Sequence, residues 1–526
     1  MESIAKQMTR LDQFQKLSQA LDEGKWPVLV TGVAQVHKAQ IIHAITTRDR
    51  LGAVIITPDE QSAARLCEEI NLFAGEVISW QYPERELTLR PVEGVSREYE
   101  HLRLSVLSGL LEGQKGIAVA SAAAAIQLTI PPSVLRKSIR TVSAGENIPQ
   151  QELVEHLLWA GYQRCDQVEG LCQFAVRGGI VDFYPPDAPM PVRVEYWGDE
   201  IDTMARFSIE TQRREENIEK TVITPARELL YTPEQLSGIL REHLEKLTKK
   251  QRETGGAALE EDLERLADGR EIPAADRYLP LIYRERSSLL SYMGDRYLFV
   301  SDGIAVKEAV AHQLWQQEED VKQLLEEGVL TKGCDRLSVD YFDLSGLYTE
   351  HPTVLLDSFP RSYPNQRLGE LVDIRANTLS VWSGQLDTLI EDLDHYLQEG
   401  YCCMVLAGTV RGAMALADDL KGHKIPARYT KDQGEFQRGA VLVCEGGLSS
   451  GLEYPQLGLA ILTYGRAAHL PTKRKKTRSR RDGKAIKDIA DLTVGDYVVH
   501  SAHGIGQFEG IVKKEVQGVV KDYIKI

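Results

Sequence analysis

Apolar and polar positions alternate along residues 192–197, where Val, Val and Tyr are separated by Arg, Glu and Trp. This period of two is typical of a strand that buries one face. Turn residues at 178–179 and 198–199 separate this run from its neighbours. The pattern predicts a small antiparallel sheet between about residues 133 and 206.

Short uninterrupted apolar runs on both sides of this sheet predict buried parallel strands. These runs are residues 27–32, 53–58, 116–121, 296–303, 353–358, 402–408, 440–446 and 459–465. Apolar residues at helical spacing between 386 and 397 predict a helix with one buried face. A capping box of Thr232 and Gln235, with Pro233 at the first helical position, predicts the start of another helix.

Together these patterns predict an α/β multidomain chain in which a small antiparallel domain interrupts the first α/β domain. The predicted segments are the first α/β domain in two parts (1–126 and 207–350), the antiparallel domain (127–206), a second α/β domain (351–465), a basic linker (466–486) and a segment of strands and glycine turns (487–526).

Composition narrows the possible function classes. The formal net charge of −15 argues against a surface that binds nucleic acid throughout. Basic residues gather at 473–481, which is either a solvated linker or a strip that contacts phosphates or a partner. No apolar stretch reaches the roughly 18 residues that span a bilayer, and no signal peptide is evident, so we expect a cytoplasmic protein without membrane contact. The seven cysteines form no C-x-x-C pair, so we expect reduced thiols and no metal site.

The turn after the first predicted strand has the spacing of a phosphate-binding loop, G-x-x-x-x-G-K-[ST]. Gly32 and Lys38 fit this spacing, but His37 replaces the second glycine. Ala39 replaces the hydroxyl residue that would coordinate Mg²⁺. A helicase motor carries an Asp-Glu pair after the partner strand, whereas Asp302 is followed here by glycine. The segment is therefore an ordinary strand-to-helix turn or a nucleotide site that has lost its function.

The stretch FAVRGGIVDFYPPDAPMPVRVEYWGDEIDTMARFSIETQRR (174–214) closely resembles one shared by UvrB and the bacterial transcription-repair coupling factors. In those families it forms the dock for UvrA, and arginines make the contact. The resemblance implies that Arg177 contacts UvrA. It implies a second contact at Arg164 or its neighbour Gln163. Guanidinium groups suit this role because they form bidentate bonds with carboxylates.

The stretch VGDYVVHSAHGIGQFEGI (494–511) resembles the RNA-polymerase-interacting module of the same coupling factors and of CarD-type regulators. That module is a small SH3-like barrel, and the resemblance implies contact with the polymerase β subunit through Val499, His500, Ser501 and Gly504. His500 and a second histidine three residues on could also suggest a metal site, although structural roles are more common for such pairs. We expect two or three strands here, and therefore a truncated barrel.

The resemblance to the coupling factors runs from about residue 20 to the end and covers their N-terminal half. It implies a UvrB-like module with a degenerate nucleotide site, and an adaptor that recruits UvrA to stalled RNA polymerase in transcription-coupled nucleotide excision repair. ATP, Mg²⁺ and double-stranded DNA would belong to motor domains absent from this chain. We therefore expect no catalytic residue, cofactor or ATPase activity here. Two alternatives remain, a nucleotide-hydrolysing helicase relative and a purely transcriptional CarD-type regulator.

Overall fold

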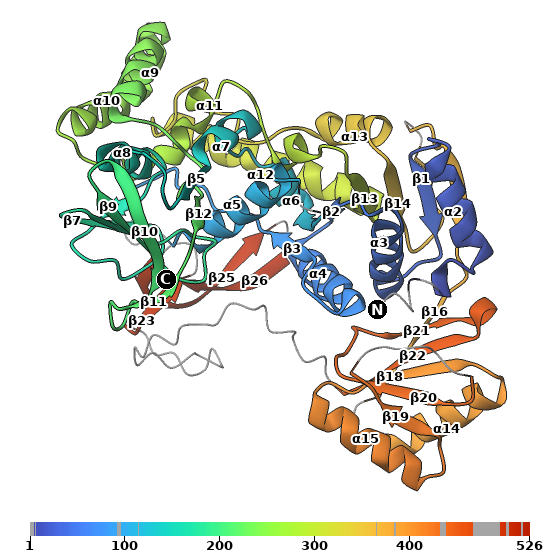
Figure 1. Ribbon diagram of the computed structural model, residues 1–526. Helices are drawn as coiled ribbons and strands as arrows, with labels where there is room; N and C mark the ends of the chain where they lie inside the picture. The colour runs from blue at the N-terminus through green and yellow to red at the C-terminus, as the bar shows by residue number, and fades with distance from the viewer. Residues whose placement is uncertain are drawn as a thin grey trace.

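The computed structural model of the chain, drawn in Figure 1, describes most of the sequence. Residues 1–4, 6, 92–95, 114, 364–365, 383–384, 432–437, 466–494, 501–503, 517–518 and 526 lie outside the described residues. The predicted basic linker and its run of lysines and arginines fall within the longest of these segments.

The first sheet contains seven strands, and every neighbouring pair is parallel. In spatial order the strands are β15 (Glu370–Asp373), β1 (Val28–Thr31), β14 (Thr353–Leu356), β13 (Tyr297–Ser301), β2 (Ala53–Thr57), β4 (Ile117–Ser121) and β3 (Ser79–Tyr82). Five of these strands are apolar runs that the sequence predicted. They are apolar on both sides because helices cover both faces of the sheet.

Helices in the described part of the chain pack on both faces of this sheet. The first group is α2 (Asp12–Asp22), α3 (Gln35–Asp49) and α4 (Glu60–Ala74). The second group is α5 (Glu98–Leu111), α6 (Ala122–Ile126), α7 (Pro132–Ser138), α12 (Gly303–Glu326) and α13 (Tyr341–Glu350). α3 follows β1 directly, so the predicted phosphate-loop position lies where this helix begins.

The boundary predicted at residue 351 is not where the two α/β sheets divide. β14 pairs with β1 and β13, and β15 pairs with β1, so both strands complete the first sheet. The second sheet begins with β16 (Asn377–Leu379). The apolar pattern identified β14 as a strand, but its partner Val28 is far away in sequence, and local periodicity does not specify pairing.

A six-stranded sheet forms the antiparallel domain. In spatial order its strands are β11 (Arg214–Asn217), β10 (Glu200–Phe207), β9 (Val192–Trp197), β8 (Ile180–Phe183), β7 (Gln173–Arg177) and β6 (Gln163–Arg164). All neighbours are antiparallel except β6 and β7. α8 (Gln150–Trp159) covers one face, and β5 (Arg140–Ser143) pairs with β12 (Lys220–Ile223) beside it.

The predicted antiparallel domain, 127–206, is therefore displaced at both ends. Its first residues include α6 and α7, which pack on the first α/β sheet. Its last residue falls inside β10, and β11 and β12 lie beyond it. β11 is fully exposed, so it has no apolar alternation from which a strand could be predicted.

A helical unit follows the antiparallel domain. α9 (Pro233–Lys246) begins at the predicted capping box, because Thr232 Oγ1 accepts a hydrogen bond from the Gln235 backbone N–H (3.2 Å) and Gln235 Oε1 accepts one from the Thr232 N–H (3.1 Å). α10 (Lys249–Ala267) follows at once. Both helices pack with the C-terminal part of α12 around one small apolar core.

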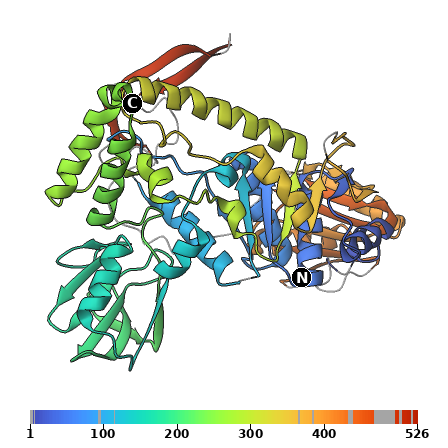
Figure 2. The same ribbon diagram turned by 90° about the horizontal axis from the view of Figure 1, so that it is seen from above.

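The second α/β domain has its own seven-stranded sheet. Its remaining strands are β17 (Val381–Trp382), β18 (Cys402–Leu406), β19 (Ala427–Tyr429), β20 (Val441–Cys444), β21 (Gly451–Tyr454) and β22 (Leu459–Tyr464). α14 (Leu386–Gln398) and α15 (Val410–Gly422) cover one face, and the other face joins the core beneath α3 and α4. Figures 1 and 2 show this domain and the antiparallel domain at opposite ends of the molecule.

The C-terminal segment contains four described strands, where two or three were expected. β23 (Tyr497–His500) pairs with β24 (Gly504–Gln507), and β25 (Gly510–Val516) pairs with β26 (Val519–Lys525), both antiparallel. These are two separate two-stranded sheets, so the SH3-like barrel stays a prediction, whereas the α/β multidomain class is confirmed. No helix in the described part of the chain is long and apolar enough to cross a membrane.

Candidate functional site

The antiparallel sheet has two different faces because its strands alternate. Val192 and Val194 of β9 point toward α8 and are buried. Arg193, Glu195 and Trp197 occupy the opposite positions of the same strand. We call this opposite side the open face, because it becomes increasingly exposed toward the hairpin tips.

A buried aspartate holds two arginines on the open face. Asp182 is fully buried, and its carboxylate accepts hydrogen bonds from Arg177 (2.8 Å) and from two nitrogens of Arg193 (2.7 and 2.8 Å). Arg193 is largely buried and stacks on Phe207, 4.7 Å from the ring centre. The side chain of Arg177 is 47% exposed. Two guanidinium groups share one carboxylate, so the cluster has a net positive charge that only Arg177 presents to solvent.

Trp197 is the second prominent side chain of the open face. It is 83% exposed, the highest value of any large apolar residue in the described part of the chain. The sequence analysis did not name it as a site residue. The sequence did contain an indication of this exposure. Trp197 occupies one of the positions in β9 that alternate with the buried residues, so an aromatic residue there is expected to be exposed.

The hairpin tips at Gly178 and Gly198 bring these side chains to the same edge of the sheet. Both glycines have positive φ angles (57° and 65°), which the tight turns require. β7 and β9 run in the same direction with β8 between them, so their ends are about 10 Å apart across two strand spacings. Gln150 of α8 donates to the Gly178 carbonyl (2.8 Å) and fixes the first tip.

Arg164 does not join this group. It lies in β6 and is exposed, but its register partner is Phe174, which belongs to the face that α8 covers. Gln163 pairs with Gln173 instead and therefore shares the face of Arg177. Of the two alternatives that the sequence left open, Gln163 is the one on the open face.

At the other candidate site, the turn between β1 and α3, backbone from the end of β15 covers Gly32. A Cβ atom on Gly32 would lie 2.4 Å from the Ile374 carbonyl oxygen, and the φ angle of 78° also favours glycine. The Asp373 carboxylate accepts a hydrogen bond from Thr31 Oγ1 (2.9 Å). The space over the turn therefore contains a carbonyl oxygen and a carboxylate, and both would repel phosphate.

His37 is completely buried at this turn. Its Nδ1 accepts a hydrogen bond from the Ala34 backbone N–H (3.2 Å), so the proton is on Nε2, which donates to the Asn377 carbonyl (3.1 Å). Tyr454 packs edge-on against the ring, with centroids 5.5 Å apart. Burial lowers the pKa of His37 to about 4, so the ring is neutral at pH 7.

Lys38 does not point to open space. Its side chain is 1% exposed, and its ammonium group donates to Ser301 Oγ (3.1 Å) and pairs with Asp302 (2.5 Å). Burial lowers the pKa of Lys38, and the carboxylate of Asp302 opposes that effect. Ala39 is buried without an oxygen that could bind a metal ion. In an active loop this lysine would neutralise phosphate charge, whereas here its charge is already neutralised by Asp302, directly after β13.

The predicted polymerase-binding residues are partly described. Val499 and His500 lie in β23, and Gly504 lies in β24 opposite His500. Ser501 falls outside the described residues. Within the described range, no group of three or more His, Cys, Asp or Glu side chains is arranged to hold a metal ion.

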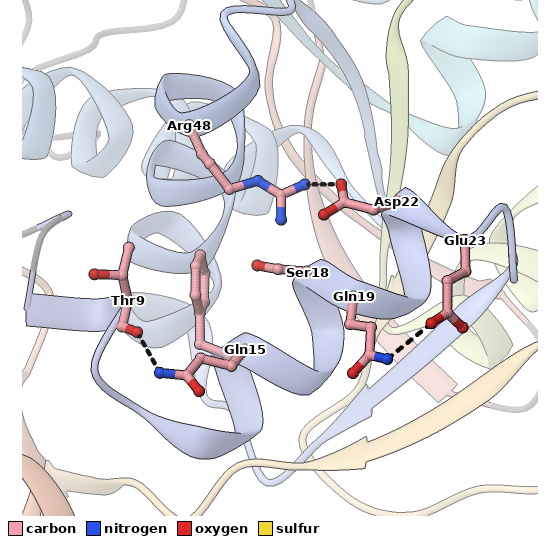
Figure 3. Close-up of a pocket in the computed structure, with 8 residues that line it drawn as sticks. Thr9, Gln15, Ser18, Gln19, Asp22, Glu23 and Arg48 are labelled. Atoms are coloured by element: carbon pink, nitrogen blue, oxygen red, sulfur yellow. Dashed lines mark hydrogen bonds and ion pairs between the residues drawn. The ribbon is translucent and has the colours of Figure 1, made fainter.

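A hollow in the described surface lies elsewhere, between α2 and the end of α3 (Figure 3). It has a volume of about 500 Å³ and is open to one side. The polar groups around it already pair with one another: Arg48 with Asp22 (2.9 Å), and Gln19 with Glu23 (2.8 Å). It contains none of the predicted site residues.

Two family models match the chain. The UvrB interaction domain matches residues 141–229, which correspond to the antiparallel domain with β5 and β12. The CarD-like/TRCF RID domain matches residues 492–526, which include β23 to β26.

Curated relatives match almost the whole chain. The transcription-repair-coupling factor of Bacillus subtilis (strain 168) is 28% identical over 540 residues, covering 100% of this chain and 45% of that protein. The factors of Staphylococcus haemolyticus and Staphylococcus aureus (strain MRSA252) are 27% and 26% identical and cover 98% of this chain. The chain spans about 45% of the length of these relatives. The predicted resemblance is therefore confirmed, and this chain is similar to the transcription-repair-coupling factors over its whole length.

Proposed function

We propose that this chain acts as an adaptor in transcription-coupled nucleotide excision repair, which recruits UvrA through the antiparallel domain and contacts RNA polymerase through its C-terminal strands. The observation that carries the proposal is the presence of a UvrB interaction domain and a CarD-like/TRCF RID domain in one chain. The geometry of the open face supports the first half, because it presents an arginine and a tryptophan on adjacent hairpin tips.

Arg177 and Trp197 are the residues that we assign to UvrA binding. Arg and Trp are the side chains that most often dominate the energy of an interface. Asp182 fixes the guanidinium of Arg177 before binding, so less conformational entropy is lost when a partner carboxylate binds its free edge. Trp197 supplies apolar area beside it. We assign no UvrA contact to Arg164, which belongs to the other face.

The experiment is isothermal titration calorimetry of UvrA with the full chain and with Arg177→Ala. Loss of a central interface arginine costs about 2 kcal/mol, so affinity should fall roughly thirty-fold. Trp197→Ala should weaken binding by a similar factor. Arg206→Ala is the matched control, because Arg206 is also a half-exposed, ion-paired arginine of this sheet but pairs with Glu216 instead. Unchanged affinity of Arg177→Ala in a folded chain would refute the assignment.

The purely transcriptional alternative makes a different prediction in the same experiment. A CarD-type regulator would bind the polymerase β subunit without binding UvrA. The adaptor should bind both proteins, and Arg177→Ala should weaken only the UvrA complex. Binding of polymerase alone by the unmodified chain would favour the regulator.

The nucleotide-hydrolysing alternative is not supported by the turn between β1 and α3. Gly32 is covered, and Lys38 is paired with Asp302. Titration with fluorescent ATP and Mg²⁺ should give no saturable binding and no turnover. Submillimolar binding that is abolished by Lys38→Ala would instead establish an active nucleotide site.

A further inference from the structure

The two α/β domains share one continuous core. Buried residues of α3 and α4 in the first domain and of β21 and β22 in the second belong to the same apolar cluster. Figure 1 shows the second domain lying against the N-terminal end of α3, which is the end that binds phosphate in active loops. The second domain therefore lies where the phosphate groups of a bound nucleotide would contact the helix.

The contacts at α3 are specific. His37 donates to the Asn377 carbonyl (3.1 Å) and packs edge-on against Tyr454. In the connection that leads from β15 of the first sheet to Asn377, the Ile374 carbonyl covers Gly32 so closely that any side chain at position 32 would collide with it. In an active loop a glycine would stand at position 37, and the backbone at Gly32 and the helix N-terminus would be open to phosphate. Here His37, the Ile374 carbonyl and the second domain occupy these places.

A second set of contacts lies at α4. Glu69 is buried, and its Oε1 accepts hydrogen bonds from the Ser449 backbone N–H (3.1 Å) and hydroxyl group. Nearby, Gly446 packs so closely on Leu72 that a Cβ atom there would lie 2.5 Å from the leucine methyl group. A buried carboxylate without hydrogen-bond partners is strongly unfavourable. The burial of Glu69 is therefore favourable only when the second domain supplies its partner Ser449.

We infer that the former phosphate-loop position is an interdomain socket, in which α3 and α4 hold the second α/β domain through His37 and Glu69. The two α/β domains therefore move as one body. Nucleotide phosphate and the second domain cannot occupy this position together. This inference is independent of UvrA binding, because the open face lies at the other end of the molecule.

The test introduces a charge on the second domain without disturbing its core. Ser449 is exposed, and Ser449→Asp places a carboxylate against Glu69. Loss of these charge-assisted bonds should accelerate hydrogen exchange of backbone amides in residues 31–40 and 374–379 by about ten-fold in the full chain. Glu69→Gln in the same chain removes the repulsion and should restore slow exchange. Gln398→Asp, at an exposed position of α14, is the charge control and should have no effect.

A second variant probes the socket from the first domain. His37→Gly removes the ring and should accelerate exchange in residues 374–379, which connect the two sheets and include β16 of the second domain. Gln35→Gly is the matched control, because it puts a glycine in the same helical turn without removing the ring. UvrA affinity should be unchanged in all five variants.

Two results would overturn the inference. One is unchanged exchange in residues 374–379 for both Ser449→Asp and His37→Gly. The other is fast exchange in those residues already in the unmodified chain. If Ser449→Asp unfolds the second domain, so that β18 and β20 also lose protection, the His37→Gly comparison decides between the two readings.

Discussion

Removing Asp302 should destabilise the first α/β domain much more than removing its partner Lys38. In Asp302→Ala the ammonium group stays buried with a serine hydroxyl as its remaining hydrogen-bond acceptor. Breaking a buried ion pair in this way costs about 3–5 kcal/mol. The Asp302 side chain is 40% exposed, which weakens the pair, so we expect about 3 kcal/mol.

Lys38→Met should behave differently. Methionine fills most of the same volume without a charge, and the carboxylate left behind can be solvated because Asp302 reaches water. We expect a change of less than about 1 kcal/mol, of either sign. In the double variant Lys38→Met, Asp302→Ala, most of the cost of Asp302→Ala should disappear, which gives a coupling energy of about 2 kcal/mol.

The assay is native-state hydrogen exchange of amides in β1 and β13, which flank the pair and report opening of this sheet. Opening free energies of the three variants and the unmodified chain form a double-mutant cycle. Equal effects of Asp302→Ala and Lys38→Met would contradict the asymmetry. A larger loss of stability for Lys38→Met than for Asp302→Ala would refute the reasoning that an unpaired buried ammonium group costs more than a solvated carboxylate.

Two further predictions concern other buried groups. Burial lowers the pKa of His37 from 6.5 to about 4, so its neutral ring stabilises the folded chain above pH 6.5. This contribution, about 3 kcal/mol at most, is lost as pH falls from 6.5 toward 4. In His37→Gln the midpoint of urea unfolding should therefore depend less on pH across that range. Asp182→Ala leaves Arg193 without its carboxylate and should cost about 3 kcal/mol. Glu216→Ala, which breaks an exposed pair, should cost less than about 1 kcal/mol, and thermal melts of both variants check the difference.

The sequence predicted elements better than it predicted their assembly. Strand β14 was identified from its apolar run but assigned to the wrong sheet, because its partners lie far away in the chain. Strand β11 was missed, because an exposed edge strand needs no apolar residues. The turn at Gly178 and the helix start at Thr232 were predicted correctly, since glycine conformation and capping are local properties.

The same limit applies to the candidate sites. Arg177, Lys38 and Asp302 were named from sequence, but Asp182 was not, and neither ion pair was predicted. Asp182 is five residues from Arg177 on a neighbouring strand, and Asp302 is 264 residues from Lys38. Register and sheet order bring these carboxylates into place, and neither follows from a local pattern. Motifs can therefore locate a cation, but only the fold shows whether its charge is free.

This difference separates the two sites in the molecule. Both lie at a glycine turn that follows a strand, one at Gly178 and one at Gly32. At Gly178 the aspartate is buried beneath the arginine, so the cation is held in place and still faces solvent. At Gly32 the lysine itself is buried against Asp302, and the neighbouring His37 is bonded to the second α/β domain, so the ammonium group cannot reach a ligand. Whether the cation at such a turn is available to a partner thus depends on which member of its ion pair the fold buries.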